Sequence, residues 1–122
     1  MIIGIGTDIT EISRIKKIDD KRAFKERWFT EKEQEYFKSR SYSSQTVACN
    51  FAAKEAFAKA LGIGLRGFSF KEVEILRDGL GKPYIVVYGN AKKIAGELGI
   101  KAFHVSLSHC REYATAYVIA EG

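Results

Sequence analysis

The segment that most constrains the fold of this chain is its alanine-rich stretch from Gln45 to Leu61. It contains no glycine or proline, and alanine has the highest intrinsic helix propensity of all residues. Gly62 follows directly, and glycine is the usual residue just beyond a helix C-terminus because it adopts positive φ at no steric cost. The sequence therefore predicts one long helix, with small residues that let another element pack closely against it.

Short segments rich in isoleucine, valine and tyrosine surround this helix and are expected to form strands. The predicted strands cover residues 2–5, 70–77, 84–88, 103–108 and 114–119. Residues 78–83, Asp-Gly-Leu-Gly-Lys-Pro, have the composition of a turn, so the second and third strands should form a hairpin. We expect an α+β fold, a mainly antiparallel sheet packed with helices, in a single domain of residues 1–122.

Three shorter helices are predicted from capping residues. Thr10 is the expected N-cap of the first helix. Thr30 and Glu33 form a T-x-x-E capping box at the start of the second helix. Asn90 should cap a third helix, which ends before the glycine at 99.

The formal net charge of +5 favours acidic partners, such as nucleic acid, polyphosphate ligands or acidic proteins, without choosing among them. Aromatic and basic residues alternate at 22–29, which leaves a nucleic-acid-binding module as the alternative. No recognised nucleic-acid motif accompanies them, and the basic residues are spread along the chain. Cys49 and Cys110 lack zinc-binding spacing. Because no stretch has the length of a membrane span or a signal peptide, we expect a cytoplasmic protein without a membrane partner. Because no nucleic-acid motif is present, we also expect no nucleic-acid partner.

The residues that could carry chemistry lie in the first strand and in the alanine-rich helix. In an extended strand, Gly4, Gly6 and Asp8 share one face, where the glycines leave room for a chain segment or a ligand. Glu55 and Lys59 have the favourable Glu-to-Lys helix spacing of a plain surface ion pair. Their small neighbours, and a second cation next to Glu55 in the sequence, also suit a site for anions and a metal.

With these residues in place, the chain resembles the holo-[acyl-carrier-protein] synthases, a family of phosphopantetheinyl transferases. The motifs that carry the resemblance are G-I-G-T-D-I at 4–9, F-T-x-x-E at 29–33, F-A-A-K-E-A at 51–56, K-A-L-G at 59–62, G-K-P at 81–83 and H-V-S-L-S-H at 104–109. Each motif alone is weak, but their order and spacing cover essentially the whole chain.

The resemblance implies an enzyme that moves phosphopantetheine from coenzyme A onto a serine of an acyl carrier protein, with Mg²⁺ as cofactor. It implies that Asp8 and Glu55 hold the metal, since one or two carboxylates are the usual protein ligands of Mg²⁺. Lys54 and Lys59 become candidates for contacts to the phosphates of the donor. The catalytic base remains open between Lys59, Glu55 and a metal-bound water.

The resemblance also implies that Gly81, Lys82 and Pro83 contact the nucleotide of coenzyme A, and that His109 lies near its phosphates. Arg14, on an exposed helix face, is the candidate for docking the acidic carrier protein. The family further implies a homotrimer with sites shared between subunits and a role in fatty acid biosynthesis. The other histidine, His104, is expected to be a core or edge residue.

One position departs from the family pattern. The residue before Phe51 is commonly arginine in relatives, where it suits a contact to a phosphate of the donor nucleotide. Here it is Asn50, which has no charge and no bidentate fork. Either Lys54 or Lys82 substitutes for the missing cation, or the nucleotide 3′-phosphate is held less firmly.

Overall fold

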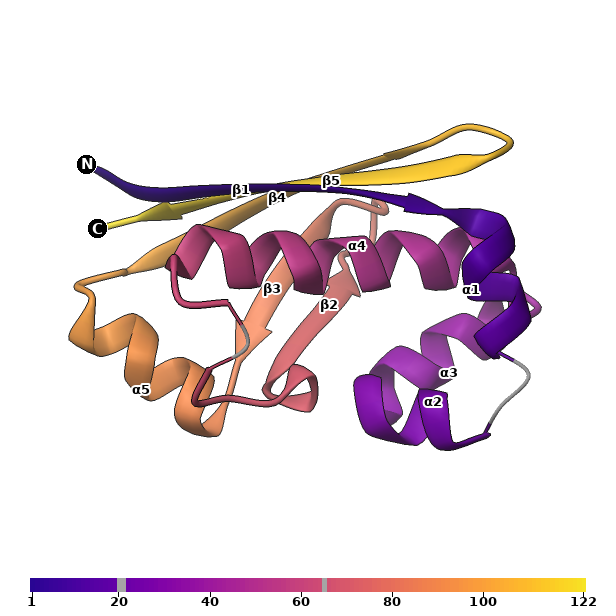
Figure 1. Ribbon diagram of the computed structural model, residues 1–122, viewed down its shortest axis with the longest axis horizontal. Coiled ribbons are helices and arrows are strands. Elements are labelled where there is room, and N and C mark those ends of the chain that lie inside the picture. Colours follow the sequence, from indigo (N-terminus) through magenta and orange to yellow (C-terminus); the bar gives the residue numbers. More distant parts are fainter. Residues whose placement is uncertain (20–21, 65) are drawn as a thin grey trace.

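The computed structural model describes residues 1–19, 22–64 and 66–122 (Figure 1). Its elements, in chain order, are β1 (Ile2–Glu11), α1 (Ile12–Asp19), α2 (Arg22–Trp28), α3 (Glu31–Ser39), α4 (Ser44–Leu61), the 3₁₀ turn η1 (Phe70–Glu72), β2 (Val73–Arg77), β3 (Pro83–Val87), α5 (Gly89–Glu97), β4 (Ala102–His109) and β5 (Tyr113–Glu121). The predicted α+β class is confirmed, with antiparallel pairing throughout the described strands.

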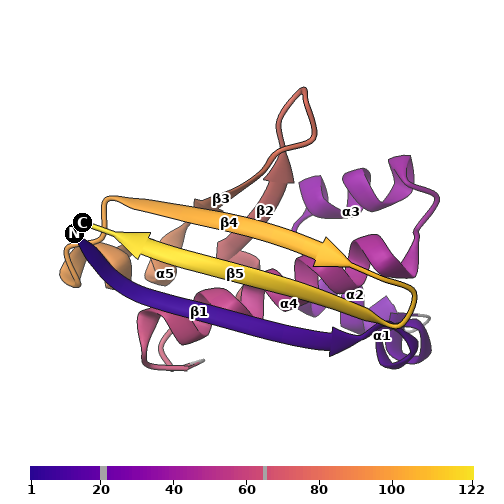
Figure 2. The same cartoon turned by 90° about the horizontal axis from the view of Figure 1, so that it is seen from above.

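The strands form two small sheets, and α4 lies along one face of the larger one (Figure 1). The larger sheet has the order β1-β5-β4, so the first strand of the chain pairs with the last. The two termini meet at one end of this pair, where the Met1 amino group donates to the Gly122 carbonyl oxygen at 3.0 Å. The smaller sheet is the β2–β3 hairpin, which lies beside β4 (Figure 2).

The glycines of β1 determine how closely this strand approaches α4. A Cβ atom at Gly4 would overlap the carbonyl oxygen of Ala60, and one at Gly6 would overlap that of Ala56. The bare strand face predicted from the sequence is therefore present, and backbone of α4 occupies it. The same alternation continues to Asp8, which places this carboxylate on the face of the sheet that α4 covers.

Three of the local predictions are confirmed in detail. The long helix α4 ends where expected, and Gly62 has the left-handed φ of 77°. In the capping box of α3, the Thr30 hydroxyl accepts from the Glu33 backbone N–H at 3.2 Å, and the Glu33 carboxylate accepts from that of Thr30 at 3.1 Å. The β2–β3 turn is closed by Asp78, whose carboxylate accepts the backbone N–H of Lys82 at 2.9 Å.

Other local predictions were wrong because tertiary contacts replaced the expected caps. Thr10 caps no helix: β1 continues to Glu11, and the Thr10 hydroxyl donates to the Asp8 carboxylate at 2.7 Å. Asn90 does not cap α5 with its side chain. Its backbone N–H instead donates to Glu72, a carboxylate from η1, which takes over the capping of this helix end.

The segment 22–29, whose aromatic residues suggested base stacking, forms α2 and packs into the core. The Trp28 ring lies 4.1 Å from that of Phe70 and 4.7 Å from that of Phe51, between centroids. Phe29 is fully buried. These rings are not the exposed stacking surface that single-stranded nucleic acid requires. None of the helices formed by residues 1–19, 22–64 and 66–122 is long and apolar enough to cross a membrane.

Candidate active site

Asp8, Glu55 and Lys59 come together where β1 crosses α4. The Lys59 ammonium donates to the Thr7 carbonyl oxygen at 2.9 Å and lies 3.7 Å from an Asp8 carboxylate oxygen. The Asp8 side chain is only 16% exposed, whereas that of Lys59 is 57% exposed. The second carboxylate oxygen of Asp8 accepts from Thr10. A positioned carboxylate and an accessible ammonium therefore share one edge of the sheet.

Glu55 is half-buried beside this pair. Burial raises the pKa of its carboxyl above the ordinary value, and the negative charge of Asp8 raises it further. The cations of Lys59 and Arg14 act in the opposite direction on that pKa. Asp8 and Glu55 are two carboxylates that repel each other where solvent is partly excluded. A cation bound between them would stabilise both in their charged forms.

The donor set suits a hard divalent cation. Among the described residues, no group of three or more His, Cys, Asp or Glu side chains converges to hold a metal, and the carboxylates of this cluster are those of Asp8 and Glu55. Mg²⁺ is usually held by one or two carboxylates, with water and phosphate oxygens completing the octahedron. The residues present fit this pattern.

Arg14 lies on α1 at the rim of the same cluster. Its side chain is exposed, and its guanidinium carbon lies 5.8 Å from the centroid of the Phe51 ring. Its charge acts on Glu55, which places a cation close to the carboxylates as well as on the surface. The exposed helix face predicted from the sequence is confirmed.

Lys54 is the clearest correction to the sequence-based site. Its side chain is fully buried, and its ammonium donates to the Glu33 carboxylate at 2.6 Å, the Trp28 carbonyl oxygen at 2.6 Å and the Phe70 carbonyl oxygen at 2.9 Å. A lysine ammonium has three donors, and all three are used. Lys54 therefore points away from Glu55 into the core and contacts no phosphate.

Asn50 belongs to the same buried network. Its amide nitrogen donates to the Glu33 carboxylate at 2.9 Å and to the Ile75 carbonyl oxygen at 3.0 Å. Its amide oxygen accepts from the guanidinium of Arg77 at 2.8 Å. Asn50 is fully buried and contacts two residues of β2, Ile75 and Arg77, in place of a ligand. Neither Lys54 nor Asn50 reaches the solvent.

A cavity of about 210 Å³ lies between the start of β3 and the end of β4. Gly81, Pro83 and His109, three residues that the sequence assigned to the donor, line it. The Cys49 sulfur lies 3.9 Å from Nδ1 of His109. Lys82 is exposed on the neighbouring turn.

Arg77 also lines this cavity, and sequence reasoning missed it. It ends a strand immediately before the turn at Asp78, where a basic residue is an ordinary exposed terminus. Only the fold shows that its guanidinium turns inward onto Asn50 and lies 4.8 Å from the centroid of the Tyr36 ring.

The cavity and the carboxylate cluster are not brought together within one chain. Thr10, next to Asp8 on the inner face of β1, pairs with Ala114 of β5, which pairs with His109 of β4. Two strand spacings of roughly 4.8 Å separate the outer pair by about 10 Å, with β1 and β4 at opposite edges of the sheet (Figure 2). On α4, Cys49 and Glu55 lie about 120° apart, at roughly 100° per residue.

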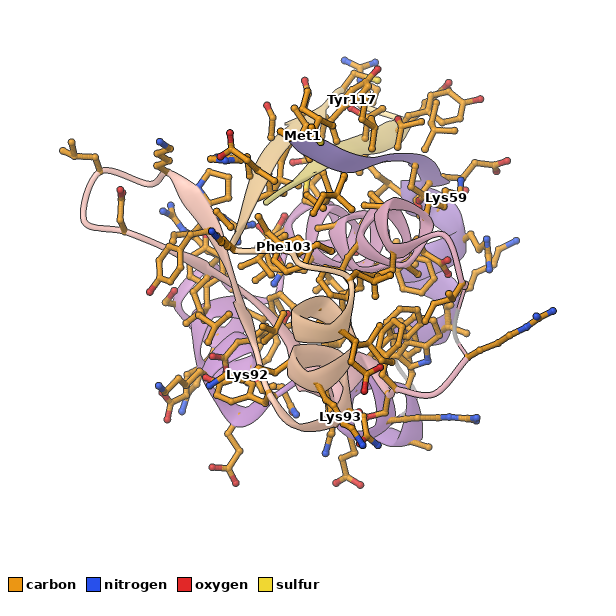
Figure 3. All side chains as sticks on the ribbon, turned by 90° about the vertical axis from the view of Figure 1, so that its left-hand side faces the viewer. Met1, Lys59, Lys92, Lys93, Phe103 and Tyr117 are labelled. Carbon is orange, nitrogen blue, oxygen red and sulfur yellow. The ribbon has the colours of Figure 1, made fainter. Side chains whose placement is uncertain are left out.

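The face of the larger sheet opposite α4 exposes several large apolar side chains from β1 and β5. Ile5 and Ile9 of β1 are 63% and 64% exposed, and Tyr117 of β5 is 57% exposed. Figure 3 shows Tyr117 on the side of the sheet away from α4. His104 projects from the edge strand β4 and lies 3.0 Å from the Glu121 carboxylate, so the predicted edge role is confirmed. This carboxylate has a lowered pKa because it is hydrogen-bonded to that imidazole.

Comparison with known proteins places this arrangement in a family. Residues 4–118 match the family described as the 4′-phosphopantetheinyl transferase superfamily, and the chain belongs to it. A holo-[acyl-carrier-protein] synthase of Clostridium perfringens is 48% identical over 127 aligned positions, which cover 100% of this chain and 96% of the relative.

Solved structures agree with the fold over the full length. The holo-[acyl-carrier-protein] synthase of Neisseria meningitidis superimposes with a TM-score of 0.92 at 39% identity, and the match covers 100% of both chains. The synthase of Bacillus anthracis, solved in complex with coenzyme A (3′,5′-ADP), gives a TM-score of 0.83 at 40% identity, covering 100% of this chain and 98% of the other.

Proposed function

We propose that this protein transfers the 4′-phosphopantetheine group of coenzyme A to a serine hydroxyl of an apo acyl carrier protein. The serine oxygen forms a bond to the phosphorus that bears pantetheine, and the bond from that phosphorus to the bridging oxygen of the pyrophosphate breaks. Adenosine 3′,5′-bisphosphate leaves with the bridging oxygen. The observation that carries the proposal is the cluster of Asp8, Glu55 and Lys59 at the crossing of β1 and α4. The names of the relatives and the coenzyme A complex of one of them support it.

Each residue of the cluster has a physical role in this reaction. Asp8 and Glu55 would hold Mg²⁺, which when bound neutralises charge on the pyrophosphate of the donor. The exposed ammonium of Lys59 binds phosphate oxygens and is held in place by the Thr7 carbonyl oxygen. Glu55, which lies beside Asp8 and Lys59, is our candidate for the acceptor of the serine proton.

The nucleotide end of the donor requires the second group of residues. We assign Gly81, Lys82, Pro83 and His109 to it, and these lie across the sheet from Asp8 within one chain. A site shared between two subunits would let β1 of one subunit face the cavity of its neighbour. The apolar outer face of the sheet supports association of subunits, and we propose a homotrimer.

In this proposal the acceptor is an acidic carrier protein. It docks on Arg14, which lies close to Glu55. The protein would act in the cytoplasm, in fatty acid biosynthesis and related lipid metabolism.

The test is to incubate the protein with Mg²⁺, coenzyme A and an apo acyl carrier protein and to measure the mass of the carrier. We expect a gain of one phosphopantetheine on the acceptor serine. Asp8→Asn and Glu55→Gln should each slow the transfer by at least about 100-fold, because a group that stabilises transition-state charge is lost. Glu97→Gln, on an exposed position of α5, is the matched control and should leave the rate unchanged.

Two readouts separate a catalytic effect from a folding defect. Circular dichroism should show unchanged secondary structure in both carboxylate variants, and their Mg²⁺ dependence should shift to higher concentration. A Glu55→Gln protein that works at the normal rate under limiting Mg²⁺ would contradict the metal assignment. A carrier that gains no mass with the unaltered protein would contradict the function itself.

A further inference from the structure

The guanidinium of Arg77 is built into the cavity at the end of β4 and lacks a partner for one of its nitrogens. Its Nη2 donates to the Asn50 amide oxygen at 2.8 Å. Its Nη1 is buried and has no hydrogen-bond partner among the residues that the structure describes. A buried donor without an acceptor costs free energy, and the cost is larger when the donor is charged. A ligand that supplies the missing acceptor would explain why this buried guanidinium nitrogen has no partner in the protein.

The surroundings of the guanidinium select an anion. None of the described residues that line the cavity is acidic, and His109 adds a second nitrogen-bearing side chain. The cavity of about 210 Å³ is smaller than the ~300–1,000 Å³ of sites for whole drug-sized ligands. It has the size of a site for a phosphate with part of its sugar.

The guanidinium is held in place by residues from two other elements. Asn50 of α4 fixes Nη2, and Asn50 is itself fixed by Glu33 and by the Ile75 carbonyl oxygen. The Tyr36 ring of α3 lies 4.8 Å from the guanidinium carbon. Asn50 therefore acts as a positioning residue, and Arg77 supplies the cation that position 50 lacks.

We infer that Arg77, positioned by Asn50, binds the 3′-phosphate of the nucleotide donor and gives this protein its preference for coenzyme A over dephospho-coenzyme A. The inference rests on the proposed function and deepens it. The pyrophosphate of the donor is assigned to Asp8, Glu55 and Lys59 at the opposite edge of the sheet. The phosphomonoester is the remaining phosphate of the donor, and Arg77 offers it a charge-assisted hydrogen bond.

The experiment measures the dissociation constants of coenzyme A and of dephospho-coenzyme A by titration calorimetry, with Mg²⁺ and without a carrier protein. The two ligands differ only in the 3′-phosphate, so their ratio isolates this contact. Arg77→Gln should weaken the binding of coenzyme A by about 10- to 100-fold, as expected for a lost hydrogen bond to a charged group. It should change the binding of dephospho-coenzyme A by less than about twofold.

Arg40→Gln is the matched control, because Arg40 also lies over the Tyr36 ring, at 5.6 Å, but does not line the cavity. It removes the same charge nearby and should leave the ratio unchanged. If Arg77→Gln does not fold, Arg77→Lys serves in its place. That variant keeps the charge without the planar fork, and the preference for coenzyme A should fall without vanishing.

Equal weakening of both ligands in the Arg77 variants, or no weakening, would overturn the assignment. Failure of the function gives a different result, because the unaltered protein would then bind neither ligand and modify no carrier. An unaltered protein that modifies the carrier but binds both ligands equally well would overturn the assignment while the function stands.

Discussion

Replacing Lys54 by methionine tests whether the buried lysine is a structural residue. The ammonium makes three hydrogen bonds, to the carboxylate of Glu33 and to the carbonyl oxygens of Trp28 and Phe70. Methionine fills a similar volume but leaves a buried carboxylate without its counter-charge. Removing one partner of a buried pair typically costs about 3–5 kcal/mol. A domain has a total stability of roughly 5–15 kcal/mol, so Lys54→Met should lose a large share of it.

The free energy of unfolding is measured in urea, followed by the fluorescence of Trp28, the single tryptophan, at one fixed protein concentration. Lys59→Met is the matched control: its side chain is 57% exposed, and the change should be within about 1 kcal/mol. The double variant Lys54→Met/Glu33→Gln should be more stable than Lys54→Met alone, since it also removes the unpaired charge.

The buried network also makes a prediction about ligand binding. Because the Lys54 ammonium contacts no ligand, the variant that remains folded should bind coenzyme A normally. If Lys54→Met is as stable as Lys59→Met but binds coenzyme A far more weakly, the structural role is refuted. The original interpretation of Lys54 as a phosphate ligand would then be correct.

Two further substitutions test surfaces of the molecule. Arg14→Glu should raise the KM for the carrier protein several-fold at low salt, and less at high salt, without changing the KM for coenzyme A; Lys93→Glu, an exposed cation of α5, is its control, and equal effects of both would disprove the docking role. Ile9→Lys, at a position 64% exposed on the outer sheet face, should convert the proposed trimer into monomers in sedimentation velocity and abolish transfer. Leu98→Lys should leave assembly intact, and a persistent trimer with Ile9→Lys would place the interface elsewhere.

Local sequence signals predicted the elements whose stability is local. Helix α4 follows from alanine content and a terminal glycine, and the hairpin follows from the turn composition between two β-rich segments. The capping box at Thr30 and Glu33 needs only residues three positions apart. The bare face of β1 also follows from alternation along a strand, although its occupant, the backbone of α4, does not.

The same local reasoning failed where a distant residue took over a local role. Thr10 is of a residue type that is common at N-caps, but its hydroxyl donates to Asp8 within a longer strand. Asn90 is also of such a type, but its backbone N–H donates to Glu72, which belongs to another element. Helix α2 went unpredicted because its charged residues hide the aromatic side that packs against Phe51 and Phe70. In each case a tertiary contact outweighed a propensity of a few tenths of a kcal/mol to about one.

By itself, the sequence determined the α+β class, the long helix and the ordered motifs that mark the family, because propensity, turns and motif spacing are properties of neighbouring residues. Only the tertiary structure decided which lysine of α4 is buried and which is exposed. Lys54 and Lys59 are both basic residues of one helix, yet one is fully buried on Glu33 and the other is exposed beside Asp8. Arg77 likewise gains its place from Asn50, 27 residues earlier in the chain. The sequence determines the charge of a side chain, but the elements that pack around the side chain determine where it points.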